Sequence, residues 1–476
     1  MSAKRTKIVC TIGPASDSIE TLTALTEAGM NVCRLNFSHG THENHAELIK
    51  RIRQVRDVTG EPLSILQDLQ GPKIRVGEMP EEGVELLAGK PIVFTSDKGD
   101  IPKRIPVTYP NLHEDVKPGQ RLLLDDGLLE VLVKSIKGKD VTCEVITGGK
   151  LKSHKGLNLP ETETKISAIT DKDKEDLIFG VAQGVDWIAL SFVRSGEDIR
   201  QLRLLIEAEE KKLAKPREVP IGIIAKIEKP QAVEKMDEII AEVDAIMVAR
   251  GDLGIEMPAE KVPVIQKDLI KKCLALGKPV IVATQMLDSM IRNPRATRAE
   301  VSDIANAVID HADATMLSGE TASGEHPLEA VKTMAATIIE TEKSSYDDLP
   351  VQTRLKNTDD EAITNVASIL SQMTDTKAIL VAAMNGGAAR LVSHFRPEVP
   401  ICAALPSEEV AHQLNLSWGV RPMYLEGAKT IPELIEKGLE ELKRQKLVSA
   451  GDEIVIVAGD QLGDSGHVQL VELKKV

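Results

Sequence analysis

The chain has 476 residues, which predicts two or three domains rather than one core, and its formal net charge is −14 at pH 7. This charge and an aromatic content of 2% argue against a nucleic-acid partner, because phosphates attract cations and unpaired bases stack on aromatic rings. The five cysteines form no CxxC pair, so we expect a cytoplasmic protein without disulfides or a thiolate zinc site. No apolar stretch approaches the roughly 20 residues that span a membrane, so we expect no membrane partner.

Eight short runs of apolar and β-branched residues recur along the chain, and most are followed by a helical pattern. The runs cover residues 7–13, 30–37, 63–69, 187–192, 222–228, 244–251, 279–285 and 313–319. The last five begin roughly 23 to 35 residues apart, the length of one strand–helix unit. Eight buried parallel strands alternating with helices predict a (β/α)8 barrel of the TIM type, formed by residues 1–72 and 166–343.

Two further segments depart from this rhythm. Residues 73–165 contain short strands and turn signals such as DDG and KGKD, which predict a small β-barrel inserted after the third strand. An insertion at that point lies at the mouth of the barrel, so we expect it to act as a lid. After a polar linker, residues 344–476 return to helices and strands and predict a C-terminal α/β domain with a regulatory role.

Polar side chains follow the predicted barrel strands at their carboxyl ends, where barrel enzymes carry their functional groups. In chain order these residues are Arg34, Asn36, Ser38, His39, Asp68, Lys226, Glu228, Arg250, Gly251, Asp252, Thr284, Gln285, Ser318 and Glu320. Because so many of the strand ends are polar, we expect a binding or catalytic site there.

The segment KIEKP (226–230) places Lys226 and Glu228 on the same side of an extended strand. One interpretation is an internal ion pair, but burying such a pair often brings no gain in stability. Together with Asp252, Glu228 offers two carboxylates at the barrel mouth, which suit Mg²⁺ or Mn²⁺. Arg34 and Lys226 would then hold an anion beside the metal.

The segment ARGDLGIE (249–256) combines two glycines with the start of a short helix. It could be only a strand-to-helix turn, and an adhesion role for its RGD does not suit a cytoplasmic chain. We prefer a ligand site, because Gly251 and Gly254 let backbone N–H groups approach a carboxylate or phosphate closely. Thr284 would add a hydroxyl from the next strand.

Three other motifs carry weaker signals. Asp125-Asp126-Gly127 could bind metal, but Asp-Gly suits a hairpin turn better. His42 and His45 lack the spacing of a helical zinc pair, so we expect them to be solvated. NGGAAR (385–390) is equally compatible with a phosphate-binding nest and with a tight turn.

At this point the chain resembles a known family. Seven segments in order, spread over residues 6–331, are similar to pyruvate kinases of the bacterial type: TKIVCTIGPAS (6–16), AGMNVCRLNFSHG (28–40), DLQGPKIR (68–75), AKIEKPQ (225–231), IMVARGDLGIE (246–256), ATQMLDSMIRNPRATRAEVSDIANAV (283–308) and MLSGETASGEHPLEAV (316–331). The resemblance implies the three-part fold described above. It also implies a cytoplasmic, allosteric homotetramer that performs the last step of glycolysis.

That resemblance assigns roles to matching positions. It implies transfer of the phosphoryl group of phosphoenolpyruvate to ADP, giving ATP and pyruvate. Arg34 and Lys226 would contact the phosphoryl group, Glu228 and Asp252 the Mg²⁺ or Mn²⁺, and Gly251, Asp252 and Thr284 the substrate carboxylate. The nucleotide residues would be Asn36, Ser38, His39, Arg75 and Lys155. Thr284 or an ordered water would protonate the enolate, with Lys226 less favoured.

The chain departs from the family pattern at two places. The K⁺ site of many pyruvate kinases uses Asn, Ser, Asp and Thr with a nearby Glu; here Asn36, Ser38 and Asp68 are present, but Leu69 and Lys73 replace the last two. A fixed ammonium at Lys73 could substitute for K⁺, so we expect that K⁺ is not required. NGGAAR and the late loop GDSGHVQL (463–470) lack most phosphate-binding hydroxyls. We therefore expect weak or no activation by fructose 1,6-bisphosphate, with AMP and ribose 5-phosphate left open.

Two other functions are compatible with parts of the pattern. A metal-dependent aldolase or lyase acting through a pyruvate enolate would share the metal carboxylates but would not need a lid, Arg75 or Lys155 for a nucleotide. A non-catalytic sensor would use the C-terminal domain. The intact set of Lys226, Glu228, Asp252 and Thr284 argues against the sensor.

Overall fold

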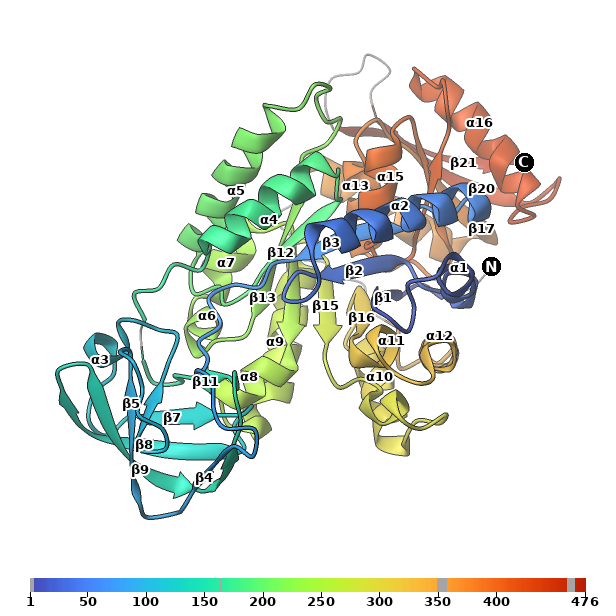
Figure 1. Ribbon diagram of the computed structural model, residues 1–476. Coiled ribbons are helices and arrows are strands. Elements are labelled where there is room, and N and C mark those ends of the chain that lie inside the picture. The colour runs from blue at the N-terminus through green and yellow to red at the C-terminus, as the bar shows by residue number, and fades with distance from the viewer. Residues whose placement is uncertain (1–3, 163, 349–357, 460–466) are drawn as a thin grey trace.

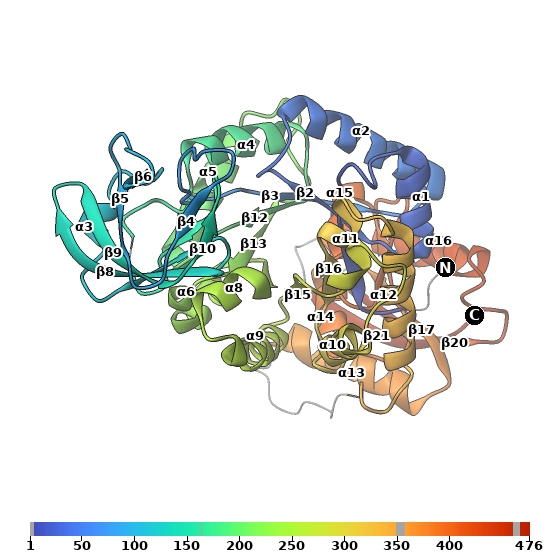
Figure 2. The ribbon, with the colours of Figure 1, turned by 60° about the horizontal axis from the view of Figure 1, so that its bottom comes forward.

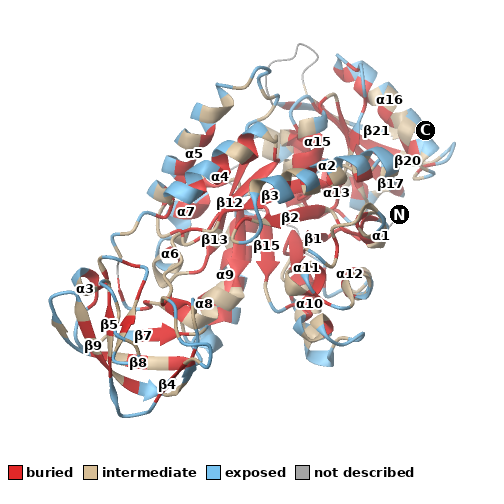
Figure 3. Cartoon of the chain, viewed as in Figure 1, coloured by how far each residue is buried: buried red, intermediate tan, exposed pale blue. Residues whose placement is uncertain are grey.

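A closed barrel of eight parallel strands forms the centre of the computed structural model, which describes residues 4–162, 164–348, 358–459 and 467–476 (Figure 1). The strands are β1 (Lys7–Thr11), β2 (Val32–Asn36), β3 (Ser64–Asp68), β12 (Trp187–Leu190), β13 (Gly222–Ile227), β14 (Ala245–Ala249), β15 (Val280–Ala283) and β16 (Ala314–Leu317). All eight predicted runs are confirmed. Their side chains are buried on both faces, between the barrel interior and a sheath of helices (Figure 3).

The helices of the sheath follow their strands as a (β/α)8 barrel requires. They are α1 (Ile19–Ala28), α2 (His42–Thr59), α4 (Asp171–Ala182), α5 (Gly196–Glu210), α6 (Pro230–Glu234), α7 (Met236–Glu242), α8 (Arg250–Glu256), α9 (Val262–Ala275), α10 (Arg298–Ile309), α11 (Gly319–Ala322) and α12 (Pro327–Thr341), with short helices η1 (Ala259–Lys261) and η2 (Asp288–Ile291). Capping boxes at Thr41, Thr170 and Thr297 define where three of them begin.

The insertion between β3 and α4 has its own hydrophobic core. Its elements are β4 (Val84–Leu86), β5 (Pro91–Thr95), β6 (Arg104–Pro106), α3 (Leu112–Asp115), β7 (Arg121–Leu124), β8 (Leu129–Lys137), β9 (Asp140–Thr147), β10 (Gly149–Leu151) and β11 (Leu157–Asn158). They form a six-stranded sheet, β11-β7-β8-β9-β5-β6, and a two-stranded sheet, β10-β4. Among the described residues these pairings do not close a ring, so a small barrel remains a prediction.

The C-terminal segment forms a separate five-stranded sheet in the order β19-β18-β17-β20-β21. Its elements are α13 (Asp359–Met373), β17 (Thr376–Ala382), α14 (Gly387–His394), β18 (Ile401–Leu405), α15 (Glu408–Leu414), β19 (Val420–Tyr424), α16 (Ile431–Arg444), β20 (Glu453–Gly459) and β21 (Val468–Lys475). Figures 1 and 2 show this domain and the insertion on opposite sides of the barrel. The predicted boundaries at 72/73, 165/166 and 343/344 remain predictions.

Two features of the C-terminal segment bear on the expectations above. Most of the late loop, residues 460–466, lies outside the described residues. Gly386 in NGGAAR has a positive φ of 75° and precedes α14, as a tight turn into a helix requires. In the part of the chain that the structure describes, no helix is long and apolar enough to cross a membrane.

Gly222 marks a point of close packing inside the barrel. It pairs with the buried Trp187 of the neighbouring strand, and a Cβ added at Gly222 would lie 2.4 Å from a Trp187 ring carbon. Gly222→Ala should therefore destabilise the fold by about 1–3 kcal/mol, the usual cost of overpacking a core, seen as a lower midpoint of thermal unfolding. Gly254→Ala is the matched control, because its Cβ would have no neighbour nearer than 3.9 Å. Equal midpoints for the two variants would contradict this packing.

Candidate active site

Lys226 near the end of β13 is the centre of a buried ion cluster at the mouth of the barrel. Its Nζ lies 2.8 Å from Glu228 Oε1 and 3.3 Å from Asp68 Oδ1, and it donates to Ser191 Oγ at 2.8 Å. Arg34 at β2 completes the cluster, because its Nε donates to Asp68 Oδ2 at 2.7 Å. We call Arg34, Asp68, Lys226 and Glu228 the rim cluster. Four residues from three strands therefore meet, as the strand-end pattern predicted.

The electrostatics of the rim cluster keep its cations charged. Burial disfavours the ammonium of Lys226, but Asp68 and Glu228 outweigh that effect and raise its pKa. Burial would also raise the pKa of Asp68, but Lys226 and Arg34 lower it below its usual value. Asp68 thus stays ionised and holds both cations in place. Arg34 also donates from Nη1 to Thr11 Oγ1 at 2.8 Å, which fixes the plane of its guanidinium.

Glu228 and Asp252 form the candidate metal pair. Glu228 is 1% exposed, and its Oε2 accepts from the Phe192 backbone N–H at 2.8 Å. Burial and the nearby Asp252 raise the pKa of Glu228 despite the opposing effect of Lys226. A divalent cation relieves such repulsion between carboxylates, and Mg²⁺ commonly takes one or two protein carboxylates, with substrate and water filling its other positions. The pair therefore fits Mg²⁺ or Mn²⁺; no group of three or more acidic, His or Cys ligands occurs among the described residues.

Gly251 and Thr284 lie together between β14 and β15. The Gly251 backbone N–H donates to Thr284 Oγ1 at 2.7 Å, and Thr284 and Gln285 have φ angles of 72° and 55°. Left-handed backbone at two consecutive non-glycine residues is strained, and such strain gathers at functional sites. Arg250 holds the turn, because its Nη2 donates to the Thr284 carbonyl at 2.8 Å. The predicted carboxylate pocket is therefore assembled by α8 and this turn.

The predicted nucleotide residues fall into two groups. Asn36, Ser38 and His39 follow β2, where the Ser38 N–H donates to Asn36 Oδ1 at 3.1 Å. Arg75 and Lys155 lie on the inserted domain: Arg75 donates to the His154 carbonyl at 2.8 Å, and Lys155 pairs with Asp125 at 2.7 Å. Within the described residues no hydrogen bond or ion pair joins the two groups, so their convergence on a nucleotide remains a prediction.

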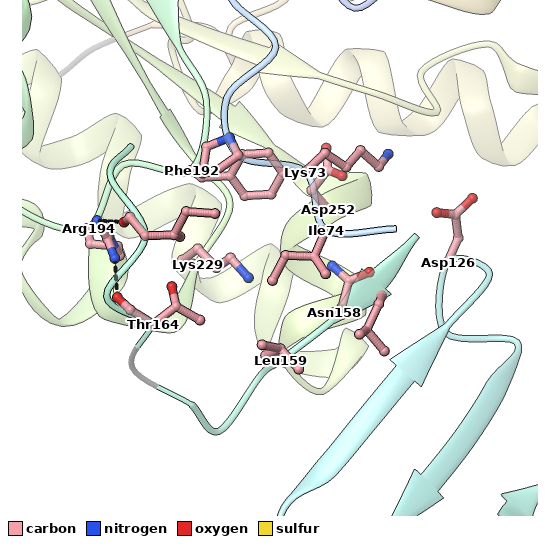
Figure 4. A pocket seen from close by; sticks show the side chains of 13 residues that line it. Lys73, Ile74, Asp126, Asn158, Leu159, Thr164, Phe192, Arg194, Lys229 and Asp252 are labelled. Atoms are coloured by element: carbon pink, nitrogen blue, oxygen red, sulfur yellow. Dashed lines mark hydrogen bonds between the residues drawn. The ribbon is translucent and has the colours of Figure 1, made fainter. Parts of the chain in front are cut away.

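Leu69 and Lys73 occupy the segment that leads into the inserted domain. Leu69 is 1% exposed and packs in the barrel core, while its carbonyl accepts from Ser191 Oγ at 2.7 Å. Lys73 lines a cleft with Asp126 and Asp252, and Figure 4 shows its ammonium pointing toward the Asp126 side. Among the described residues its Nζ has no hydrogen bond or ion pair, so an unpaired ammonium lies at the cleft.

Two family models cover most of the chain. The model described as "Pyruvate kinase, barrel domain" matches residues 3–331, and "Pyruvate kinase, alpha/beta domain" matches residues 361–473. The chain belongs to the pyruvate kinase family. It is therefore an enzyme of the phosphotransferase class, as the motifs predicted.

Individual pyruvate kinases resemble this chain over almost its full length. The enzyme of Geobacillus stearothermophilus is 45% identical in an alignment of 476 positions that covers 99% of this chain and 80% of that protein. The enzyme of Staphylococcus saprophyticus is 45% identical in an alignment of 483 positions, which also covers 99% of this chain and 80% of that protein. A crystal structure of a pyruvate kinase from Cryptosporidium parvum is 35% identical, with a TM-score of 0.90, covering 99% of this chain and 96% of that one.

Some residues of the site were not predicted from the sequence. Ser191 joins Lys226 to the Leu69 carbonyl, and Phe192 donates its N–H to Glu228. Both directly follow β12, so the strand-end argument applied to the fourth run would have found them. Glu256 and Lys229 pair beside the cleft, and no spacing in the sequence indicates that contact.

One histidine prediction was wrong. His45 is 6% exposed rather than solvated, because its ring stacks on Phe37 with centroids 3.9 Å apart. His42 is partly exposed and pairs with Asp176 at 2.7 Å. The two aromatic neighbours, Phe37 and Phe179, come from separate elements. Asp125-Asp126-Gly127 lies in the hairpin loop that joins β7 to β8, as expected, with positive φ at all three residues.

Proposed function

We propose that the rim cluster, with Asp252 and Thr284, transfers the phosphoryl group of phosphoenolpyruvate to ADP. The observation that carries this proposal is the pair of cations, Arg34 and Lys226, held on one buried carboxylate, Asp68, beside the acidic pair Glu228 and Asp252. A transferring phosphoryl group spreads negative charge over its equatorial oxygens, and positioned cations stabilise that charge. The cluster is thus preorganised for the transition state.

Each cation has a separate part in the transfer. The Arg34 guanidinium, held in plane by Asp68 and Thr11, presents its free N–H groups to the phosphoryl oxygens. The Lys226 ammonium follows the phosphoryl group as the enol oxygen–phosphorus bond breaks and the bond to the ADP β-phosphate oxygen forms. The electron pair of the broken bond stays on the enolate oxygen.

Glu228 and Asp252 would hold Mg²⁺ or Mn²⁺ in this site. When bound, the ion supplies charge stabilisation for the phosphoryl group and the enolate. The two carboxylates would hold it beside Lys226. The Phe192 N–H keeps Glu228 oriented through Oε2.

The substrate carboxylate would lie at the start of α8. The backbone N–H groups of Gly251 and Asp252 and the Thr284 hydroxyl would bind it. The Thr284 hydroxyl donates to the Ala283 carbonyl at 2.6 Å and accepts from Gly251. Binding of the carboxylate would replace these two contacts, and either Thr284 or an ordered water beside it would then give the proton to the methylene carbon of the enolate.

The inserted domain would close over the substrates as a lid. Asn36, Ser38 and His39 would contact ADP from the barrel, and Arg75 and Lys155 from the lid. A closed lid excludes water, which would otherwise take the phosphoryl group. We further propose a cytoplasmic homotetramer with no nucleic-acid or membrane partner.

A coupled assay tests the proposal against a lyase. The wild-type protein with phosphoenolpyruvate, ADP and Mg²⁺ should form ATP and pyruvate in equal amounts, with no pyruvate when ADP is omitted. Pyruvate formed without ADP would be hydrolysis and would contradict the transfer, and ligand binding without turnover of phosphoenolpyruvate would favour the lyase or the sensor.

The Lys73 ammonium supports independence from K⁺. Wild-type activity should be the same with and without K⁺ in a sodium-free assay, because a fixed cation already faces the cleft. The double variant Leu69→Thr/Lys73→Glu should lose about tenfold in activity without K⁺ and recover it with K⁺. A tenfold change in rate corresponds to about 1.4 kcal/mol of activation free energy. Lys73→Gln is the control, which removes the charge without adding a ligand for K⁺. Strong K⁺ activation of the wild type would refute the substitution.

A further inference from the structure

The carboxylate of Glu256 joins three parts of the molecule. Glu256 ends α8 and is 5% exposed. Its Oε1 accepts from Asn158 Nδ2 of the lid at 2.8 Å and pairs with the ammonium of Lys229. Lys229 directly follows Glu228, and Asp252 lies at the other end of α8. Through this one oxygen, α8 is joined both to Asn158 of the lid and to Lys229, the neighbour of Glu228.

Phe192 connects Lys229 with the metal pair. Lys229 Nζ lies 5.6 Å from the centre of the Phe192 ring, and the Phe192 N–H is the donor to Glu228. Asn158, Lys229, Phe192 and Asp252 line one cleft between lid and barrel, with about 590 Å³ of space that is partly open to solvent. Figure 4 shows Lys229 and Asn158 pointing toward each other across it.

A second part of the lid lies close to the same helix. The turn at Gly127, between β7 and β8, lies so close to α8 that an added Cβ would be 3.6 Å from Ile255 Cγ2. Glu256 is next along the chain. The lid therefore approaches α8 at two neighbouring residues, Ile255 and Glu256.

The two oxygens of Glu256 differ in their surroundings. Among the described residues, Oε2 is buried without a hydrogen bond. A buried carboxylate is costly unless it is paired and hydrogen-bonded. With the lid in place Glu256 has Asn158 and Lys229; with the lid removed it would keep only Lys229. The Asn158 bond therefore favours the docked lid, while the buried Oε2, without a hydrogen bond among the described residues, is a cost of that state.

We propose that Glu256 is a positioning residue that latches the lid over the active site and aligns it with the metal pair. We call Asn158, Lys229 and Glu256 the latch. This inference rests on the proposed phosphoryl transfer. A docked lid keeps water from the phosphoryl group, so the latch raises the fraction of phosphoenolpyruvate whose phosphoryl group reaches ADP.

A double-mutant cycle in the full chain tests the latch. Asn158→Ala removes the donor from the lid, and Glu256→Met removes the acceptor at similar volume. Each should lower kcat/KM about tenfold, the effect of losing a hydrogen bond to a charged group, and lower the ATP formed per pyruvate below one. The double variant should be no worse than Glu256→Met alone, because both act through one contact. Glu260→Gln, on an exposed neighbour, should match the wild type.

A second measurement keeps the latch separate from the reaction and from folding. Amide hydrogen exchange of residues 156–159 should be faster in both variants than in the wild type, while the barrel strands keep their protection. The exchange difference does not depend on ATP formation. If the proposed function is wrong, the wild type makes no ATP, and the exchange difference between wild type and variants still tests the latch. Wild-type kinetics and exchange in Asn158→Ala, or fully additive losses in the double variant, would overturn the latch.

Discussion

Lys226→Met should lower kcat for ATP formation by about 10³-fold, at the upper end of what one transition-state contact contributes. The ammonium is the only cation that touches both Asp68 and Glu228 among the described residues, and it faces the site proposed for the phosphoryl group. Its loss leaves Glu228 without an ion-pair partner among the described residues and leaves Asp68 with Arg34 alone. The measurement is the initial rate of the coupled assay at saturating phosphoenolpyruvate, ADP and Mg²⁺.

The same substitution affects stability, so a control is needed. Breaking a buried ion pair costs about 3–5 kcal/mol, and the thermal unfolding midpoint of Lys226→Met should fall. Lys226→Arg keeps the charge but not the geometry of a compact ammonium. It should fold better than Lys226→Met and still lose most activity. Near wild-type kcat in a folded Lys226→Met protein would show that the ammonium does not act on the phosphoryl group.

Glu228→Gln and Asp252→Asn should each raise the Mg²⁺ concentration for half-maximal activity by about 100-fold, because even supporting residues around a metal change affinity 10- to 100-fold. Each variant removes one of the two carboxylates proposed to bind the ion. The check is a titration with Mg²⁺ and, without substrates, a direct measurement of Mn²⁺ binding by electron paramagnetic resonance.

Asp126→Asn provides the matched control for the metal pair. Asp126 lines the same cleft but lies on the lid turn. Its Mg²⁺ requirement should equal that of the wild type. If Asp126→Asn shifts the titration as much as Glu228→Gln, the metal is bound differently from the arrangement proposed here.

The barrel and the centre of the site were predictable because each rests on a local pattern. Every barrel strand is a short apolar run, and parallel strands in a barrel bring their carboxyl ends to one rim. Arg34, Lys226 and Glu228 are thus predicted to meet from strand order alone, and their contacts confirm it.

The remaining features depend on contacts between distant segments. The Asn158–Glu256 bond joins residues 98 positions apart across two domains, and nothing in either segment specifies the partner. His45 was misjudged for the same reason, since its helix is polar overall and only the tertiary fold brings Phe37 onto its ring. Lid closure and nucleotide contacts likewise need the position of one domain relative to another.

The most direct test of the central claim is a crystal of the wild-type protein grown with Mn²⁺ and oxalate, a planar dianion shaped like the enolate of pyruvate. The anomalous signal of Mn²⁺ should lie within bonding distance of Glu228 and Asp252, with oxalate against Gly251 and Thr284 and Lys226 beside it. Mn²⁺ ordered away from both carboxylates, or oxalate bound where Arg34 and Lys226 cannot reach it, would contradict the account.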